Sequence, residues 1–463
     1  MGTGGLGTRG PRSLRGGGDR ARPTYLKRGM MKTPLIAVLA VVVLFPIAAS
    51  PAAEPLATFV VDVGKHERGE TPVSATLPKG VAATGELRLV ETTAGKQAEV
   101  PCQTEKTDPP TLWWVLTGTT PAGAKRTFQL LPGKPAAKAG RVEARKGEEA
   151  TELVVVGADG KDAGKVLRYY HAPLAPPEGV SAKFARSAFI HPAWSPSGAV
   201  LTCNFPRDHY HHKGLWNPWT KTQFRGQTVD FWNLGAGKAT VRFKEYASLD
   251  SGPVFGGFVA RHEHVVFPGK GEEVVALHET WQVRAWNVGG PQRGFWLWDI
   301  GFTQRCATDD PLIVKKYSYG GMGWRGAEPW QGQAAYGLTS EGKTRKDGNG
   351  TRARWCALGG TVDGKTAGGV LMTHPGNFLF PEPMRVWPTG MKGVFVSFTA
   401  AQLGDFHIEP GKDYVWRYRF CGHDGKVDPA LADRLWADFG EPPTITVTPG
   451  AKAGPVGTDA RRR

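Results

Sequence analysis

Three of the chain's twelve histidines fall within four residues, between an aspartate and a lysine. The segment Asp208–Lys213 reads Asp-His-Tyr-His-His-Lys. If it is extended, His209 and His211 point to one side and Asp208 and His212 to the other, because side chains alternate along a strand. Imidazole titrates close to neutral pH, so these histidines could act as general acid and base. The segment therefore predicts a catalytic or binding site.

A metal site is a second interpretation of the same residues. Two imidazoles two residues apart on a strand can share one divalent ion, and copper or iron would suit them. His209 and His211 are the candidate metal ligands, although nothing in the sequence requires a cofactor. A further ligand could come from one of four residues elsewhere in the chain, namely His191, His278, His374 and Asp299. A third interpretation is structural, with the histidines hydrogen-bonded to neighbouring loops.

Tryptophans surround the histidines. Four of the chain's sixteen tryptophans lie between His191 and Asn233. Aromatic rings stack on the apolar faces of sugars while neighbouring polar groups bind the hydroxyls. We therefore expect a small-molecule or oligosaccharide substrate, with Trp216 and Trp232 as stacking platforms. The alternative is that these tryptophans belong to the core.

Further candidate residues are spread over the later part of the chain. Arg325 follows a glycine-rich segment and could present its guanidinium to substrate oxygens. His374 lies in a His-Pro turn and joins His209, His211 and His212 as a catalytic candidate. By contrast, His264 is expected at the surface. The predicted substrate-binding residues are His191, Asp208, Lys213, Trp216, Trp232, His278, Arg284, Arg325, Asn377 and Arg385.

The elements that must position these residues are mostly strands. Polar and apolar residues alternate over Val275–Trp286, with His278, Thr280 and Arg284 on the polar face. Such a face indicates either a polar groove on a broad sheet or an ordinary solvent face. Glu279 falls on the apolar face, where a carboxylate needs a partner, often an arginine.

Two more elements can be predicted with their boundaries. Lys165–His171 could pair with Ala239–Tyr246, since both alternate. One helix is expected near the end of the chain, capped by Asp428, with Pro429 in its first position and Gly440 as its stop. The chain is therefore predicted to be all-β: a large antiparallel β-sandwich with a small N-terminal β layer and a short C-terminal helix.

The N-terminus predicts a targeting segment. Residues 1–29 are rich in Gly and Arg and are expected to be disordered, upstream of a translation start at Met30 or Met31. Residues 30–53 contain Lys32, the apolar run Leu35–Phe45 and then small residues, as in a signal peptide. The run is shorter than the roughly 20 residues that span a bilayer. A secreted or periplasmic product is expected.

The rest of the chain divides into three expected parts, and its composition limits the partners. These parts are an N-terminal β subdomain at 54–158, a β-sandwich domain carrying the site at 159–441, and a flexible tail at 442–463. The formal charge of +16 falls to +9 without residues 1–53, and no nucleic-acid motif accompanies it. The part after residue 53 has no segment suited to stable membrane insertion. We therefore expect neither nucleic acid nor membrane as a partner.

Several motifs together resemble the methane oxygenase PmoA-like family of exported bacterial proteins. The resemblance covers nearly all of the chain after the signal peptide. The motifs are His-Pro with Ser-Pro-x-Gly (His191–Gly198), Asp-His-x-His-His-Lys-Gly-Leu-Trp (Asp208–Trp216), Asp-Phe-Trp (Asp230–Trp232), Gly-Gly-x-Gly-x-Arg (Gly320–Arg325), Gly-Thr-x-Ala-x-Trp (Gly350–Trp355), His-Pro-x-Asn (His374–Asn377) and Tyr-Arg-Phe with His-Asp-Gly (Tyr418–Gly425). Lys213 stands where the family more often has arginine, which keeps the charge but loses the planar fork.

The family name implies a metal-dependent oxygenase, whereas the all-β layout resembles the galactose-mutarotase type of super-sandwich. The leading functional hypothesis is a carbohydrate-active enzyme that uses histidine acid–base chemistry for epimerisation, elimination or hydrolysis. No Asp/Glu pair typical of a two-carboxylate glycosidase can be placed. The alternatives are a copper or iron oxygenase, as the resemblance implies, and a non-catalytic sugar-binding module.

Overall fold

The computed structural model describes residues 54–81, 86–93 and 96–451. The expected disordered segment and signal peptide therefore lie outside the described residues. The described chain is built almost entirely of antiparallel strands that form two sandwiches. Its one α-helix is α1 (Pro429–Gly440), and no helix in these ranges has the length and apolar character needed to cross a membrane. All five cysteines are free.

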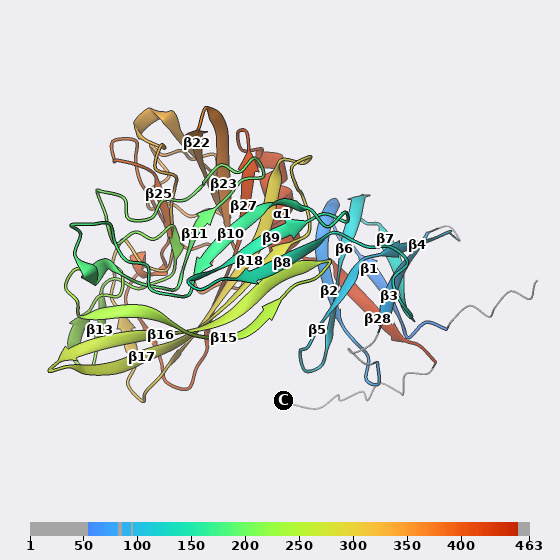
Figure 1. Cartoon of the computed structure of the whole chain (residues 1–463), viewed down its shortest axis with the longest axis horizontal. Helices are drawn as coiled ribbons and strands as arrows, with labels where there is room; N and C mark the ends of the chain where they lie inside the picture. Colours follow the sequence, from blue (N-terminus) through green and yellow to red (C-terminus); the bar gives the residue numbers. More distant parts are fainter. Residues whose placement is uncertain (1–53, 82–85, 94–95, 452–463) are drawn as a thin grey trace, which may run out of the picture. The chain divides into compact units, whose positions relative to one another are not determined.

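The smaller sandwich comes mainly from the N-terminal part of the chain. A five-stranded sheet (β28-β1-β7-β3-β4) and a three-stranded sheet (β2-β6-β5) share one core, in which Phe59 contacts Trp114. Figure 1 shows β28 in red beside the blue strand β1. The strands are β1 (Ala57–Asp62), β2 (Arg68–Thr76), β3 (Leu87–Thr93), β4 (Lys96–Val100), β5 (Cys102–Glu105), β6 (Thr111–Thr120), β7 (Lys125–Pro132) and β28 (Thr444–Pro449).

The larger sandwich consists of two eight-stranded sheets, here called sheet 1 and sheet 2. Sheet 1 has the order β24-β25-β20-β12-β11-β10-β9-β8, and sheet 2 the order β15-β16-β17-β18-β27-β23-β22-β21. Sheet 1 contains β8 (Arg141–Lys146), β9 (Ala150–Val156), β10 (Asp162–Tyr170), β11 (Phe189–Ala193), β12 (Leu215–Trp216), β20 (Met322–Arg325), β24 (Met384–Val386) and β25 (Phe395–Phe398). Sheet 2 contains β15 (Ala239–Asp250), β16 (Phe255–Gly269), β17 (Glu272–Trp286), β18 (Phe295–Cys306), β21 (Ala335–Thr339), β22 (Trp355–Val362), β23 (Lys365–Thr373) and β27 (Tyr414–Asp424).

The core of the large sandwich lies between the inner faces of sheets 1 and 2. In β17, Trp281 and Val283 belong to this core, while Gln282 between them is exposed. This alternation is the predicted one, and it aims the polar face of β17 away from the core. A small four-stranded sheet adjoins the core and comprises β13 (Thr222–Phe224), β14 (Gln227–Val229), β19 (Leu312–Val314) and β26 (Phe406–Ile408).

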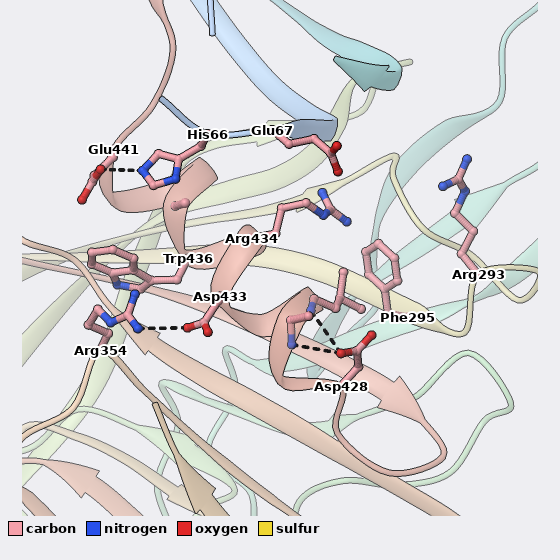
Figure 2. A pocket seen from close by; sticks show the side chains of 13 residues that line it. His66, Glu67, Arg293, Phe295, Arg354, Asp428, Asp433, Arg434, Trp436 and Glu441 are labelled. Carbon is pink, nitrogen blue, oxygen red and sulfur yellow. Dashed lines mark hydrogen bonds and ion pairs between the residues drawn. The ribbon is translucent and has the colours of Figure 1, made fainter. Parts of the chain in front are cut away.

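Helix α1 covers part of the outer face of sheet 2. Its apolar residues Leu435 and Trp436 pack with outward-facing side chains of sheet 2. The Asp428 side chain accepts hydrogen bonds from the backbone N–H groups of Ala430 and Leu431, with Pro429 in the first turn, as predicted. Figure 2 shows this cap beside the cavity that α1 lines. The all-β prediction with one C-terminal helix is confirmed.

Three predicted details differ from the structure. β10 pairs with β9 and β11, not with β15, which lies in the other large sheet. β8 and β9 belong to sheet 1, so the N-terminal strands of the small sandwich end at Pro132, before residue 158. The expected flexible tail contains β28, which pairs with β1; only residues 452–463 lie outside the described chain. The first two differences come from pairing between strands that follow one another in the chain, and the third from pairing between its two ends.

Candidate active site

The histidine segment forms consecutive turns over the outer face of sheet 1 and is not an extended strand. The N–H of His209 donates to the carbonyl of Pro206, and the N–H of His212 to that of His209, each at 2.9 Å. The prediction of alternating sides was therefore wrong. The turns nevertheless gather the three imidazoles of His209, His211 and His212, whose ring centroids are 4.7–5.4 Å apart.

Arg325 fixes this segment to the sheet. It lies on β20 next to Trp324, which faces the inner core, so the side chain of Arg325 faces outward. The buried guanidinium donates through Nη2 to both Asp208 oxygens, at 2.9 and 3.1 Å, and to the carbonyl of Lys392 at 3.2 Å. It also lies 4.6 Å from the ring centroid of Trp387. The guanidinium that was expected to face substrate oxygens thus contacts Asp208, another predicted substrate-binding residue.

Asp208 in turn contacts a histidine. Its Oδ2 lies 3.0 Å from Nδ1 of His209, whose side chain is 33% exposed. Burial would raise the pKa of Asp208, but Arg325 and His209 outweigh it and hold the pKa below its usual value. The carboxylate therefore stays ionised near neutral pH. With Nδ1 facing Asp208, the Nε2 atom of His209 is the ring nitrogen left for a substrate.

The two other imidazoles are kept neutral. Burial, reinforced by the neighbouring His209 and Lys213, lowers the pKa of His211 to about 3. His212 is completely buried, and burial lowers its pKa well below the ordinary value. Within the described chain its Nδ1 has no hydrogen-bond partner. His211 and His212 can thus donate or accept hydrogen bonds at neutral pH but carry no charge.

An aromatic cluster supports the histidines from below. It consists of Phe189, Trp216, Trp232, Trp387 and Phe395. The His212 ring lies 5.1 Å from Trp216 and 5.5 Å from Trp387. Trp216 and Trp232 are 0% and 2% exposed, so their faces are covered by protein and cannot stack on a sugar. The prediction of stacking platforms was wrong, because these rings pack against the buried side of the histidine segment.

Sequence reasoning missed Trp387, although it contacts more of the site than any predicted tryptophan. It lies next to Arg325, His209 and His212, and its Nε1 donates to the hydroxyl of Tyr319 at 3.1 Å. The only local signal is Val-Trp-Pro at 386–388, a strand end followed by a turn. Its distance from the histidines along the chain concealed the contact.

The imidazoles do not form a metal centre. The candidate ligands His209 and His211 have ring centroids 5.4 Å apart and ring planes at 72° to each other. In residues 54–451, apart from the two short gaps, no group of three or more His, Cys, Asp or Glu side chains is arranged to hold a metal ion. The donor set therefore does not fit the copper or iron that the oxygenase alternative implies.

Two predicted residues lie beside the site but serve the fold. Lys213 is fully buried; its ammonium donates to the carbonyl of Phe184 at 2.9 Å and lies 3.1 Å from the ring centroid of Phe205. Burial lowers the pKa of Lys213 to about 6. On β11, His191 Nδ1 contacts the Thr202 hydroxyl at 2.8 Å. Its pKa falls to about 4, chiefly through burial. Lys213 is therefore not available to a substrate.

The remaining predicted residues do not converge with the histidine segment. Arg385 is on β24 of sheet 1, with its guanidinium 5.0 Å from the centroid of the Tyr319 ring. His278 and Arg284 are on the outer face of β17 in sheet 2. His374 packs edge-on against Phe439 of α1, with centroids 4.9 Å apart. Asn377 is buried, and its side chain is saturated by Thr373, Glu382 and the backbone of Arg417. These residues therefore do not share one cavity with the histidine segment, because they belong to two sheets.

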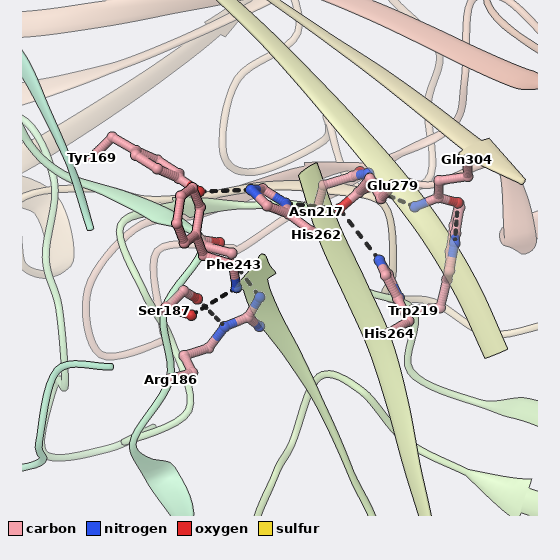
Figure 3. Close-up of polar contacts among 11 residues, drawn as sticks. Tyr169, Arg186, Ser187, Asn217, Trp219, Phe243, His262, His264, Glu279 and Gln304 are labelled. Atoms are coloured by element: carbon pink, nitrogen blue, oxygen red, sulfur yellow. Dashed lines mark hydrogen bonds and ion pairs between the residues drawn. The ribbon is translucent and has the colours of Figure 1, made fainter. Parts of the chain in front are cut away.

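A second group of histidines is buried between the two sheets (Figure 3). His262 and His264 on β16 approach Glu279 Oε2 at 3.4 and 3.3 Å, and Asn217 and Gln304 donate to Oε1 at 2.9 and 2.7 Å. All five side chains are at most 4% exposed. His264 was expected at the surface, which is wrong. As predicted, Glu279 is paired within the core, but its partners are histidines and amides instead of an arginine.

This interior network holds Glu279 as an anion. Burial would raise its pKa, but His264 and His262 lower it below the usual range. On the other side, the Tyr169 hydroxyl lies 2.6 Å from His262 Nε2, and burial raises the pKa of Tyr169 well above its ordinary value. Every polar atom of the Glu279 carboxylate is thus satisfied inside the core, and the network is closed to solvent.

A family model matches residues 154–437, more than half of the chain. It describes a family of unknown function, DUF6807. This chain belongs to the DUF6807 family. The matched range begins in β9 and ends within α1, so the family region is the large sandwich with the histidine segment and its helix. A comparison with curated protein sequences gives no match.

Several solved structures share a remote likeness with this DUF6807 protein. An α-mannosidase from Enterococcus faecalis is 10% identical, with a TM-score of 0.42, over 86% of this chain and 47% of that one. A heparan sulfate lyase from Pedobacter heparinus is 8% identical, with a TM-score of 0.31, over 64% and 38%. An α-galactosidase from Lactobacillus brevis is 7% identical, with a TM-score of 0.28, over 65% and 42%. The chain spans less than half the length of each.

Proposed function

We propose that this DUF6807 protein is an exported enzyme that performs acid–base chemistry on a carbohydrate. The observation that carries the proposal is the contact between Asp208 and Nδ1 of the partly exposed His209. The two atoms lie at ion-pair distance without hydrogen-bond geometry, so the carboxylate acts through its charge and stabilises the imidazolium that forms when Nε2 takes a proton. Arg325 supports the arrangement, because its guanidinium keeps Asp208 both ionised and in place.

In this proposal His209 exchanges the proton with the substrate. Nε2 removes a proton from a hydroxyl, an activated C–H group or a water molecule and returns it later in the same cycle, so no redox partner is needed. His211, neutral and half-buried beside it, would hydrogen-bond a substrate oxygen. This chemistry suits epimerisation, elimination or hydrolysis.

A carbohydrate is proposed because of the groups that reach solvent around His209. Asp208, His211 and Tyr210 add a carboxylate, an imidazole and a phenol, all of which hydrogen-bond hydroxyls. The tryptophans beneath are closed and rigid, which favours precise positioning of these groups over direct stacking. Export through a signal peptide at 30–53 would bring the enzyme to extracellular or periplasmic sugars.

The test is turnover of a panel of mono- and oligosaccharides in D₂O, followed by NMR. Isotope exchange, anomer conversion and bond cleavage are thereby detected in one experiment. The wild type is expected to convert at least one sugar. His209→Ala should lower kcat/KM about 10²- to 10⁴-fold, and Asp208→Asn at least about tenfold. Purified protein should need no added metal.

The matched control is His278→Ala, which removes an exposed imidazole from the outer face of sheet 2. Its activity should equal that of the wild type. Full activity in His209→Ala would overturn the assignment of the acid–base group. Binding of sugars without turnover by the wild type would instead identify a binding module, and stoichiometric copper or iron lost in His209→Ala/His211→Ala would favour the oxygenase.

A further inference from the structure

A cavity of about 400 Å³ lies on the outer face of sheet 2, away from the histidine segment. Its floor comes from β17, β18 and β27, and Phe439 of α1 lines it as well. Thr280, Gln282 and Arg284 reach it from β17, since the residues between them face the inner core. This is the polar face that the alternation of β17 predicted. Its volume matches one or two sugar units.

The charges around this groove do not balance. Arg284 pairs with Glu105 of the N-terminal sandwich. Asp299 is neutralised by the buried Arg419, whose Nε and Nη2 donate to its two oxygens at 2.6 and 2.9 Å. Arg417 also lines the groove, yet among the residues that the structure describes its guanidinium has neither a hydrogen-bond nor an ion-pair partner. One positive charge therefore remains uncompensated there.

Neither of the titratable groups close to Arg417 provides a negative charge that could pair with its guanidinium. His374 lies close to it, and burial, together with Arg417, lowers the pKa of this imidazole. The nearest carboxylate of the groove, Asp299, is already held by Arg419. A ligand with one negative charge would complete the site, and a carboxylate can accept two parallel hydrogen bonds from a guanidinium.

Other groups in the groove are typical of sugar recognition. The amide of the exposed Gln282 and the hydroxyls of Thr280 and Thr303 can donate and accept hydrogen bonds. The half-buried Phe439 ring lines the groove and is held by His374 at its edge and by Arg419, 4.8 Å from its centroid. A fixed ring beside hydroxyl-binding groups is a surface on which a pyranose can rest.

The larger cavity beside α1 has no arginine without a carboxylate partner. It measures about 830 Å³ and appears in Figure 2. Each of its three arginines already has a carboxylate partner: Arg293 pairs with Glu70, Arg354 with Asp433, and Arg434 with Asp438. Of these two cavities, only the smaller groove therefore contains an arginine without an anionic partner among the described residues.

We propose that the groove over β17, β18 and β27 binds an acidic sugar of one or two units, a uronate. Its carboxylate pairs with Arg417, its hydroxyls bind Gln282, Thr280 and Thr303, and its ring lies against Phe439. The site is separate from His209, which lies over sheet 1, so it is a binding site in addition to the proposed catalytic one.

Calorimetric titration of the full chain tests this with D-glucuronate and D-galacturonate. D-glucose and D-galactose are the matched neutral ligands, and acetate is a carboxylate without hydroxyls. At least one uronate should bind, and its neutral counterpart and acetate should each bind about tenfold more weakly or worse, because a hydrogen bond to a charged group is typically worth that factor. Equal binding of uronate and neutral sugar, or no uronate binding at millimolar concentration, would overturn the proposal.

Variants locate the binding. Arg417→Gln should weaken uronate binding about tenfold or more, and Gln282→Ala a few-fold; both side chains are exposed, so melting temperatures should match the wild type. Arg305→Gln is the control, an exposed arginine of β18 outside the groove. His209→Ala should leave uronate binding unchanged, which separates this site from the catalytic proposal. Unchanged affinity in Arg417→Gln, or loss in His209→Ala alone, would contradict it.

Discussion

Two pairs of histidines in this chain have the same spacing and opposite surroundings. His209 and His211 lie two residues apart, as do His262 and His264. The first pair sits in turns over sheet 1, half-exposed, with Asp208 at 3.0 Å from one ring. The second pair lies on β16 with both rings aimed into the core at Glu279. The His-x-His spacing therefore does not determine whether an imidazole is reactive or structural.

The difference lies in the backbone that carries each pair. On a strand, residues i and i+2 share a face, so His262 and His264 both reach one carboxylate across the ladder. In the turns after Pro206, local hydrogen bonds bring the rings of His209, His211 and His212 together instead. Three of the four ring nitrogens of the interior pair contact Glu279 or Tyr169, whereas in the described chain no contact occupies Nε2 of the partly exposed His209. An unsaturated, oriented imidazole is the one suited to chemistry.

The largest expected effect comes from removing the interior anion. Glu279→Ala should lower the free energy of unfolding by about 3–5 kcal/mol, because it leaves two buried histidines and two amides without their common partner. Chemical denaturation measures this. Glu245→Ala, an exposed carboxylate of β15 paired only with Arg261, should change stability by less than about 0.5 kcal/mol. A loss below about 1 kcal/mol for Glu279→Ala would mean that the network is not structural.

The next largest effect is the difference in stability between a variant of the interior histidine pair and a variant of the outer pair. His264→Ala should cost about 1–3 kcal/mol of stability, since it removes one contact to Glu279 and opens space in the core. His209→Ala should cost less than about 0.5 kcal/mol, because its side chain is one-third exposed. The same denaturation experiment compares them. Equal losses for both variants would remove the distinction drawn here.

The smallest expected effect is on the pH dependence of stability. His212 is buried with its pKa well below that of the unfolded chain, near 6.5, so unfolding takes up a proton once the pH falls below about 6.5. The stability of the wild type should therefore fall between pH 7 and pH 5. Burial lowers the pKa of His191 and His211 as well, so both contribute to the same loss. His212→Phe should therefore reduce this dependence without abolishing it, while His407→Phe, at an exposed position, should retain it in full. Unfolding midpoints in denaturant, measured for the wild type and both variants between pH 7 and pH 5, test this prediction.

Much of the fold follows from local sequence patterns. The alternation of β17 predicted its inner and outer faces, including Glu279 on the inner face and the polar groove on the outer one. The capping residue Asp428 and Pro429 fixed the start of α1. These features depend on neighbours within one element, where the period of the side chains is set by backbone geometry.

What the sequence by itself determined, then, is the class of the fold, the faces of its long strands and the cluster Asp208–His212 as a candidate site. Only the tertiary structure decided that Arg325 and Trp387 complete this site, that His264 is buried and that His374 lies against Phe439 of another element. The physical reason is that strand order brings together segments more than a hundred residues apart, and no local pattern records which outer face a loop will cover.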